Sequence, residues 1–583
     1  DLSLDKMNGN IPSTKGINRK SDGSRDSFAS ALHTSGLGGL DMDSQPLEPF
    51  TTEAELNKIL EDDDAFSEDS LDSQGEFPNS KVSARSSMPN LPPENHTEII
   101  AQIQRSITSP DFETAPPSTK QDKLKKFFGE EAAAEAATAG KSTINDTPTF
   151  LGYDYDPAEI VVNMEGDVKG GTLTALTERL TSHKYLDTNF NGTFLLTYRS
   201  FCTTDELLGL LEARYNLQPP NDLTEEQLQL WYEQKLKLVR LRVFNVLKNW
   251  IETYFIDEDN MVLERLQRFA NITMRDTLSF SADQLDKLIK KRQETDDQGG
   301  LRKMVLNLGV QAPAPIVPKN MKRLKLLDID SLELARQLTI LDFKLYSSIR
   351  PIECLNKAWS KDDDRGDIAV NVKSSIEFCN QVTAWVTDTI LSQNEIRKRT
   401  NVIKYWVQVA ERCRQLNNFN TCMAILSAFD NSAIGRLRRT WDIVGARTQH
   451  TLAYIRKLMG ANKNFTEYRE IIHSINPPCI PFLGIYLQDL TFIEDGNSDY
   501  LKKSKSLINF SKRMKTAEVI REIQQYQSAP YALEPVKEIQ YVIHLNLQNS
   551  RDEDTLYALS CALEPRERED EKIARLLQES GFL

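Results

Sequence analysis

The sequence predicts an all-α protein with two helical modules behind a long disordered segment. From about residue 160 onwards, apolar residues recur at three- and four-residue spacing, and strand-like alternation is scarce. Several segments also begin with capping boxes, which mark helix starts. The first 150 residues lack this periodicity and are rich in Ser, Asp, Gly, Pro and Asn. We therefore expect residues 1–155 to be a disordered, acidic regulatory tail.

The charge of the chain is concentrated in this tail. The whole chain carries 71 basic and 85 acidic residues, a net charge of −14. Residues 1–150 hold 14 basic and 26 acidic residues, whereas residues 151–583 hold 57 and 59. Because the helical part has no basic excess, we expect no nucleic-acid partner. The acidic run Glu61–Asp72 fits a solvated tail, and alternatively a regulatory segment phosphorylated at Ser67 and Ser70.

The first helical module is expected over residues 156–293. Capping boxes predict three helix starts there, at Thr203/Glu206, Thr224/Gln227 and Ser281/Gln284. The helix that starts at Thr224 should continue to about Tyr254, because its apolar positions can bury one broad face. Residues 294–326 then form a linker. Three prolines in APAPIVP exclude a helix interior and predict a stiff, extended connector.

The second module is expected over residues 327–565, followed by a C-terminal tail over 566–583. Leucines at helical spacing predict a helix over 331–346. Ser392 with Glu395 should cap a helix towards Cys413, and Asn418 should cap a helix over 419–430. Pro477, Pro478 and Pro481 interrupt the chain, and a helical pattern resumes over about 498–526.

Motifs for covalent or metal chemistry are missing from the sequence. Six histidines and seven cysteines form no H-E-x-x-H, C-x-x-C or mixed ligand spacing, and no G-x-S-x-G occurs. Gly140-Lys141-Ser142 resembles the end of a phosphate-binding loop, but Glu135 stands where that motif needs Gly. We therefore expect no metal, no cofactor and no bond-making chemistry.

The sequence also bears on location. Scattered cysteines are typical of reduced thiols in an intracellular core, and no apolar run approaches the 18 residues of a membrane helix. We expect a cytoplasmic protein. The chain starts at Asp1 rather than Met, which indicates a fragment or a processed chain, so upstream adaptor or regulatory domains are possible.

The segment 477–497, PPCIPFLGIYLQDLTFIEDGN, is the candidate for function. It begins with rigid prolines, is apolar on several faces and ends in acidic residues. This pattern fits a buried helix that ends in a polar turn. It fits equally a helix that projects from the body and buries its apolar sides in a partner. Composition does not separate the two interpretations.

Several strings resemble the Ras-family guanine nucleotide exchange factors, closest to the yeast-type exchangers and Son of Sevenless. ELARQLTILDFKLYSSI (333–349), LNNFNTCMAILSAF (416–429), SINPPCIPFLGIYLQDLTFIEDGN (474–497) and INFSKRMKTAEVIREIQQYQ (508–527) are similar to the catalytic domain. GGTLTALTERLTSH (170–183) and NGTFLLTYRSFCTTDELL (191–208) are similar to the Ras exchanger motif that precedes it. The resemblance covers roughly 400 residues and leaves out 1–155.

The resemblance implies a helical bowl from which a two-helix hairpin protrudes. The first hairpin helix would be about 482–495 and the returning helix about 498–526. By position, Thr491 would face the Mg²⁺ site of a bound GTPase, and Asp495 would lie near its phosphate site. Relatives usually carry Glu at the second position and often a more apolar residue at the first, so neighbouring Glu494 is an alternative carboxylate.

Other residues lie on stretches that the family uses to grip the GTPase. These are Asn417, Asn420, Asp430, Arg436, Phe482, Leu487 and Gln488. Each also has a structural interpretation. The two asparagines would cap or brace helices, Asp430 would be a turn residue, and Arg436 would be an internal brace. Phe482 and Leu487, with Ile485, would then form hairpin core.

By resemblance, the chain would bind a Ras or Rap type GTPase, open its nucleotide site and promote GDP release and GTP loading. The alternative is a scaffold that binds a GTPase or another protein without exchange. The lipid anchor of the GTPase would recruit the chain to the inner face of the plasma membrane, so its own membrane contact would be indirect.

Overall fold

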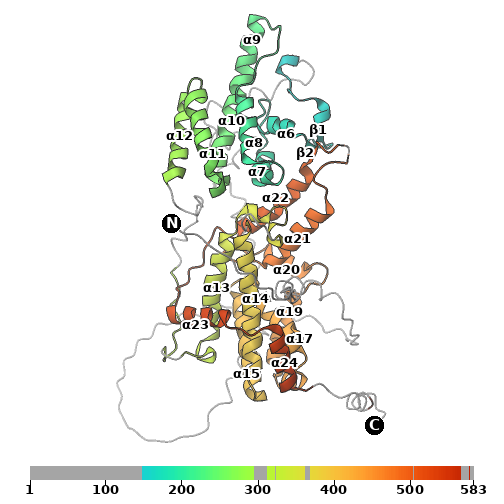
Figure 1. The fold of residues 1–583 in the computed structure, drawn as a ribbon. Helices are drawn as coiled ribbons and strands as arrows, with labels where there is room; N and C mark the ends of the chain where they lie inside the picture. The colour runs from blue at the N-terminus through green and yellow to red at the C-terminus, as the bar shows by residue number, and fades with distance from the viewer. Residues whose placement is uncertain are drawn as a thin grey trace, which may run out of the picture. The chain divides into compact units, whose positions relative to one another are not determined.

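The structure, a computed structural model, describes residues 148–294, 311–321, 324–361, 368–502, 504–565 and 577. The predicted tail up to residue 147 and nearly all of 566–583 lie outside these residues. Helices dominate the described residues, and their three strands are short, so the all-α prediction is confirmed (Figure 1).

The first module is a bundle of helices with two strands at its start. Its elements are η1 (Thr149–Leu151), η2 (Pro157–Glu159), β1 (Ile160–Val162), β2 (Val168–Gly171), α6 (Leu173–Leu180), α7 (Thr188–Thr197), η3 (Tyr198–Ser200), α8 (Thr204–Tyr215), α9 (Glu225–Trp231), η4 (Tyr232–Leu236), α10 (Lys237–Asn249), η5 (Trp250–Tyr254), η6 (Asp257–Asp259), α11 (Asn260–Arg268), η7 (Phe269–Met274) and α12 (Ser279–Glu294). Elements α9 to η5 follow one another without a break, as expected for the helix from Thr224 to Tyr254.

Two of the three predicted capping boxes are present. Thr203 and Glu206 exchange hydrogen bonds at the start of α8. The box at the start of α9 is also formed. The box at Ser281 is wrong, because α12 already begins at Ser279. Ser281 is buried inside the first turn of that helix.

The first module begins earlier than residue 156. Leu151 packs with Trp231 and Leu236 in a small apolar cluster. Asp154 lies 2.6 Å from Lys235 Nζ and 2.9 Å from an Arg214 guanidinium nitrogen. Burial alone would raise the pKa of Asp154, but these two cations hold it below its usual value. Residues before 156 therefore already belong to the packed module, because Leu151 is part of an apolar cluster and Asp154 neutralises two buried cations.

The second module contains the remaining elements. They are η8 (Leu326–Asp328), α13 (Ser331–Ser348), η9 (Pro351–Cys354), η10 (Ala358–Ser360), α14 (Val370–Leu391), α15 (Ile396–Gln415), α16 (Phe419–Asp430), α17 (Ser432–Gly435), α18 (Arg438–Asp442), α19 (Ala446–Leu458), α20 (Thr466–Ile472), α21 (Leu483–Gly496), β3 (Ile508–Asn509), α22 (Phe510–Gln525), α23 (Lys537–Gln548) and α24 (Glu553–Leu563).

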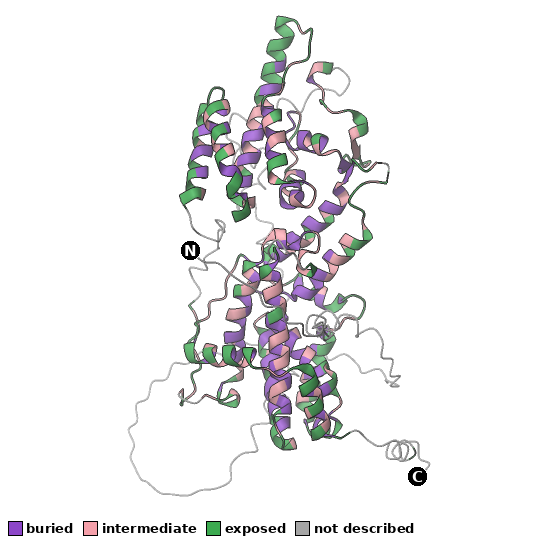
Figure 2. Cartoon of the chain, viewed as in Figure 1, coloured by how far each residue is buried: buried purple, intermediate pink, exposed green. Residues whose placement is uncertain are grey.

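The core of this module lies between α13, α14, α15 and α16, which contact one another. Trp385 and Trp406 meet edge to face at its centre, with ring centroids 4.9 Å apart. Figure 2 shows the buried faces of these long helices in purple. Asn418 caps α16 as predicted, by accepting from Thr421 N. The predicted cap at Ser392 is wrong, since α15 begins at Ile396 and the Ser392 hydroxyl donates to Asp388 O instead.

The described part of the linker is attached to α13. Ile316 N donates to Glu333 Oε2 at 3.0 Å, and Arg336 donates to Ala314 O. No helix or strand is assigned to residues 311–321. The lack of a helix in this stretch agrees with its prolines, and the stiff, extended connector stays a prediction.

A three-stranded antiparallel sheet, β1-β2-β3, joins the two modules. Gly170 and Gly171 of β2 pair with Asn509 and Ile508 of β3. A β-carbon on Gly170 would lie 2.4 Å from Ile508 O, so glycine is needed for this close approach. The segment that leads into α22 is therefore fixed to the first module by backbone pairing.

Candidate functional site

Helix α21 is buried along its first half and exposed towards its end. Leu483, Ile485, Leu487 and Leu490 are all at most 7% exposed and belong to the large core cluster. Phe482, just before the helix, is 2% exposed. These side chains form hairpin core, as the structural interpretation of Phe482 and Leu487 expected. Contact of either with a GTPase stays a prediction.

Backbone hydrogen bonds fix the start of the hairpin to the start of α16. Ile480 N donates to Asn417 O, and Phe419 N donates to Ile480 O, both at 2.9 Å. Asn417 adopts a left-handed conformation with φ of 57°, which asparagine tolerates better than most residues. The sequence strings around 417 and 480 thus meet in space.

Asn420 belongs to a buried polar cluster below the hairpin. Its amide nitrogen donates to Asp342 Oδ1 at 2.9 Å, and its oxygen accepts from Leu483 N at 3.3 Å. Thr421 donates to the other Asp342 oxygen at 2.6 Å. Burial raises the pKa of Asp342 to about 6, although these hydrogen bonds oppose the shift. Asn420 therefore braces α13, α16 and α21, and its contact with a GTPase stays a prediction.

The returning helix starts later than predicted. Helix α22 begins at Phe510, not near residue 498, and Asn509 caps it. The described residues between α21 and α22 form turns and the strand β3 instead. Their backbone pairs with β2, and this tertiary pairing overrides the local helical pattern. Helices α21 and α22 contact each other, and α22 also contacts α7 of the first module (Figure 1).

Further contacts between α22 and the first module support the hairpin from behind. The rings of Phe510 and Phe190 pack at a tilt, with centroids 4.6 Å apart. Arg521 donates to Thr193 Oγ1 at 2.8 Å. These contacts bury one side of α22 and do not involve the end of α21.

The end of α21 carries the three predicted hairpin residues on one face, since positions i, i+3 and i+4 adjoin on a helix. Thr491 is half-buried and donates to Leu487 O at 2.7 Å. Glu494 Oε1 lies 2.8 Å from Lys512 Nζ. Asp495 is 59% exposed, and its Oδ1 lies 2.5 Å from Lys357 Nζ. Asp495 is therefore the more accessible of the two carboxylates.

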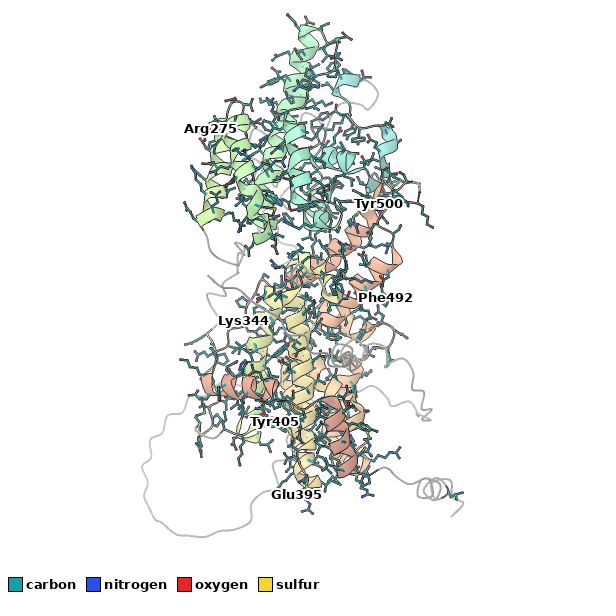
Figure 3. The ribbon with its side chains drawn as sticks, in the orientation of Figure 1. Arg275, Lys344, Glu395, Tyr405, Phe492 and Tyr500 are labelled. Carbon is teal, nitrogen blue, oxygen red and sulfur yellow. The ribbon has the colours of Figure 1, made fainter. Side chains whose placement is uncertain are left out.

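Two residues near this face complete the surface. Phe492, missed by the sequence analysis, is 60% exposed on α21 (Figure 3). Its signal in the sequence is an aromatic residue two positions before the acidic pair that ends the hairpin helix. Gln488 lies one turn before Phe492, and its buried Oε1 accepts no hydrogen bond from the described residues.

Asp430 and Arg436 lie elsewhere, at the other end of α16. Asp430 is paired with Arg456 at 2.7 Å and is 60% exposed. Arg436 donates to Ser560 O and Oγ of α24, as an internal brace would. The predicted site residues thus form two groups. One lies at the hairpin and the start of α16, and the other, Asp430 and Arg436, lies at and just beyond the C-terminal end of α16.

The end of α21 presents groups that can contact a binding partner. Among the described residues, no three His, Cys, Asp or Glu side chains are grouped to hold a metal ion. No helix in the described ranges is long and apolar enough to cross a membrane. The hairpin instead offers an exposed carboxylate, a hydroxyl and an aromatic ring on a firmly seated helix.

Comparison with protein families places both modules. The RasGEF domain model matches residues 333–514, and the RasGEF N-terminal motif matches residues 167–269. The first match contains α21 and the first turn of α22, and the second contains the elements from β2 to α11.

Curated relatives agree with these matches. Cell division control protein 25 of Candida albicans is 36% identical over 74% of this chain and 32% of its own length. Its Saccharomyces cerevisiae namesake is 35% identical over 72% of this chain and 28% of its own length. Ras guanine nucleotide exchange factor A of Dictyostelium discoideum is 34% identical over 70% of this chain and 66% of its own length. The chain thus spans about a third of the first two relatives.

Both modules occur in the order expected from the sequence, and the Candida and Dictyostelium relatives align with the chain over 438 and 419 residues. The chain belongs to the family of Ras-type guanine nucleotide exchange factors.

Proposed function

We propose that this chain accelerates GDP release from a Ras-like small GTPase by inserting the end of α21 into the nucleotide site. The observation that carries the proposal is the exposed Asp495 at the end of a helix whose first half is buried. A rigid base lets the hairpin push against a partner, and an accessible carboxylate can pair with a cation that otherwise binds phosphate.

The energetics require differential contacts. A nucleotide held with nanomolar to picomolar affinity costs about 12–16 kcal/mol to release. An exchanger offsets this cost only by binding the empty GTPase more tightly than the loaded one. Coupling is reciprocal, so nucleotide that rebinds expels the exchanger. No covalent step is needed.

Each hairpin residue has a role in this mechanism. Thr491 would occupy the region of the Mg²⁺ ion, whose loss leaves the phosphates less neutralised. Asp495 would pair with the GTPase lysine. Phe492 would cover apolar surface of the partner. Glu494 accepts a hydrogen bond from Lys512 and would stabilise the conformation of the hairpin end.

The test is release of fluorescent GDP from a panel of Ras and Rap type GTPases by the full 583-residue chain. We expect a large acceleration with at least one member of the panel. No acceleration with any member would contradict the proposal. The panel also identifies the preferred GTPase.

A second candidate function is a scaffold that binds a GTPase without exchange. The observation that favours it is that Asp495 already has a partner in Lys357. Equal affinity for nucleotide-free and nucleotide-loaded GTPase would support the scaffold, because exchange requires a difference between these affinities.

We further propose that the chain reaches the plasma membrane through the lipid anchor of its GTPase. Flotation with anionic vesicles measures this recruitment. The chain should float only when the lipidated GTPase is present. Flotation without the GTPase would show a direct membrane contact instead.

A further inference from the structure

Two carboxylates lie at the end of α21 that least favours them. The C-terminal end of a helix carries partial negative charge, so Glu494 and Asp495 are destabilised there. The last turn of α21 contains no basic residue. Each carboxylate is neutralised from another element, Glu494 by Lys512 of α22 and Asp495 by Lys357 of the loop between η9 and η10.

The two lysines differ in how firmly they are engaged. Lys512 is 1% exposed and also contacts Asp499 Oδ1 at 2.9 Å. The Lys512 side chain is thus buried and pairs with two carboxylates of the hairpin. Lys357 is 29% exposed and contacts Asp495 through Oδ1. Asp495 Oδ2 has no hydrogen-bond partner among the described residues. Half of this carboxylate is therefore available to a second cation.

The backbone of the loop has a defined conformation at Lys357. Asn356 and Lys357 both have φ of 53°, a conformation that costs free energy in residues with side chains. Lys357 O accepts hydrogen bonds from the backbone nitrogen and the hydroxyl of Ser360.

The chain before the loop is anchored as well. Glu353 is fully buried, and its Oε2 accepts from the backbone nitrogens of Asn371 and Val372 at 2.9 Å. These bonds fix η9 at the start of α14. The lysine is thus held towards the hairpin by a firmly attached loop.

We propose that Lys357 is a positioning residue for exchange, which holds Asp495 through Oδ1 so that Oδ2 faces the incoming GTPase cation. The inference rests on the proposed function and assigns a role to a residue 138 positions before the hairpin carboxylate. Without Lys357, the carboxylate rotates freely and the end of α21 loses the charge that offsets its dipole.

The experiment measures GDP release by the full chain carrying Lys357→Met, Asp495→Asn or both. Exposed ion pairs are worth up to about 1 kcal/mol, so Lys357→Met should slow exchange about three- to fivefold. The same change should have no effect in the Asp495→Asn background, because the residue it positions is gone. Lys357→Arg should retain most of the rate.

Lys398→Met is the matched control. Lys398 also forms an exposed lysine–carboxylate pair, with Glu395 at 2.8 Å, on α15. Its substitution should leave the rate unchanged. A merely structural role of Lys357 would instead lower the rate equally in both backgrounds, together with the melting temperature.

Three results would overturn the inference: an unchanged rate in Lys357→Met, a faster rate, or an equal loss in the Asp495→Asn background. A faster rate would mean that Lys357 competes with the GTPase. Failure of the proposed function is distinguishable from failure of this inference, because the unsubstituted chain would then not accelerate GDP release from any GTPase.

Discussion

The two halves of α21 are held by different forces. The first half, up to Leu490, is packed into the large apolar core of the second module. The second half, from Thr491 to Gly496, is held mainly by polar contacts with Lys357 and Lys512. Apolar burial fixes a helix against displacement, whereas an exposed ion pair such as that of Asp495 with Lys357 is weak and exchangeable. The comparison indicates a helix with a rigid base and an end that can change partners.

The largest effect is expected from the base. Ile485 is 1% exposed, so Ile485→Ala should lower the free energy of unfolding by about 2–5 kcal/mol. Exchange should fall as a consequence. Chemical denaturation measures the first effect and GDP release the second. A loss of exchange with unchanged stability would contradict a purely supporting role for the base.

Substitutions at the end of α21 should slow nucleotide exchange without lowering the stability of the fold. Asp495→Ala should slow exchange about ten- to a hundredfold, because a preorganised charge is lost, while the melting temperature stays the same. Thr491→Asp should slow exchange similarly, because a new carboxylate at that position favours Mg²⁺ retention. Thermal melting beside the release assay separates the two explanations. A lower melting temperature would place these residues in the core.

Attachment to the first module offers a third test. Gly170→Ala should clash with Ile508 O and weaken the β2–β3 pairing, at a cost of about 1–3 kcal/mol. We expect slower release of GDP from the GTPase. We also expect faster hydrogen–deuterium exchange of the backbone amides at residues 508–510. Gly166→Ala is the control for a glycine in open space, since a β-carbon there meets nothing within 4 Å, although its φ of 92° adds local strain. An unchanged rate of GDP release with the Gly170→Ala variant would show that the sheet does not support the hairpin.

The smallest effect should come from Asp342 below the base. Its pKa is raised from 3.8 to about 6, so its neutral form stabilises the fold. This stability is fully present below about pH 4 and is lost as the pH rises through 6. Asp342→Asn should flatten the pH dependence of unfolding between pH 4 and 6, by an amount on the order of 1 kcal/mol. An unchanged pH profile would contradict the buried titration.

The sequence was most informative where the structure is local. The capping boxes at Thr203 and Thr224 and the cap at Asn418 depend on neighbours three residues away, and each was predicted correctly. The start of α22 is predicted too early, because strand pairing with β2 converts a helical pattern into turns and a strand. Position along the chain cannot show such pairing.

The candidate site follows the same division. The hairpin helix that the resemblance implies, about 482–495, differs from α21 by one residue at each end. The buried contacts of Asn420 and the pairing of Asp495 with Lys357 were not predictable, because their partners lie 78 and 138 residues away. Which carboxylate is accessible therefore became clear only from the packing.

The account depends most directly on the accessible carboxylate at the end of α21. The decisive measurement compares GDP release from the preferred GTPase by the full chain and by its Asp495→Ala variant, with matched melting curves. We predict rapid release by the former and at least tenfold slower release by an equally stable variant. Equal rates for the two proteins would contradict the account.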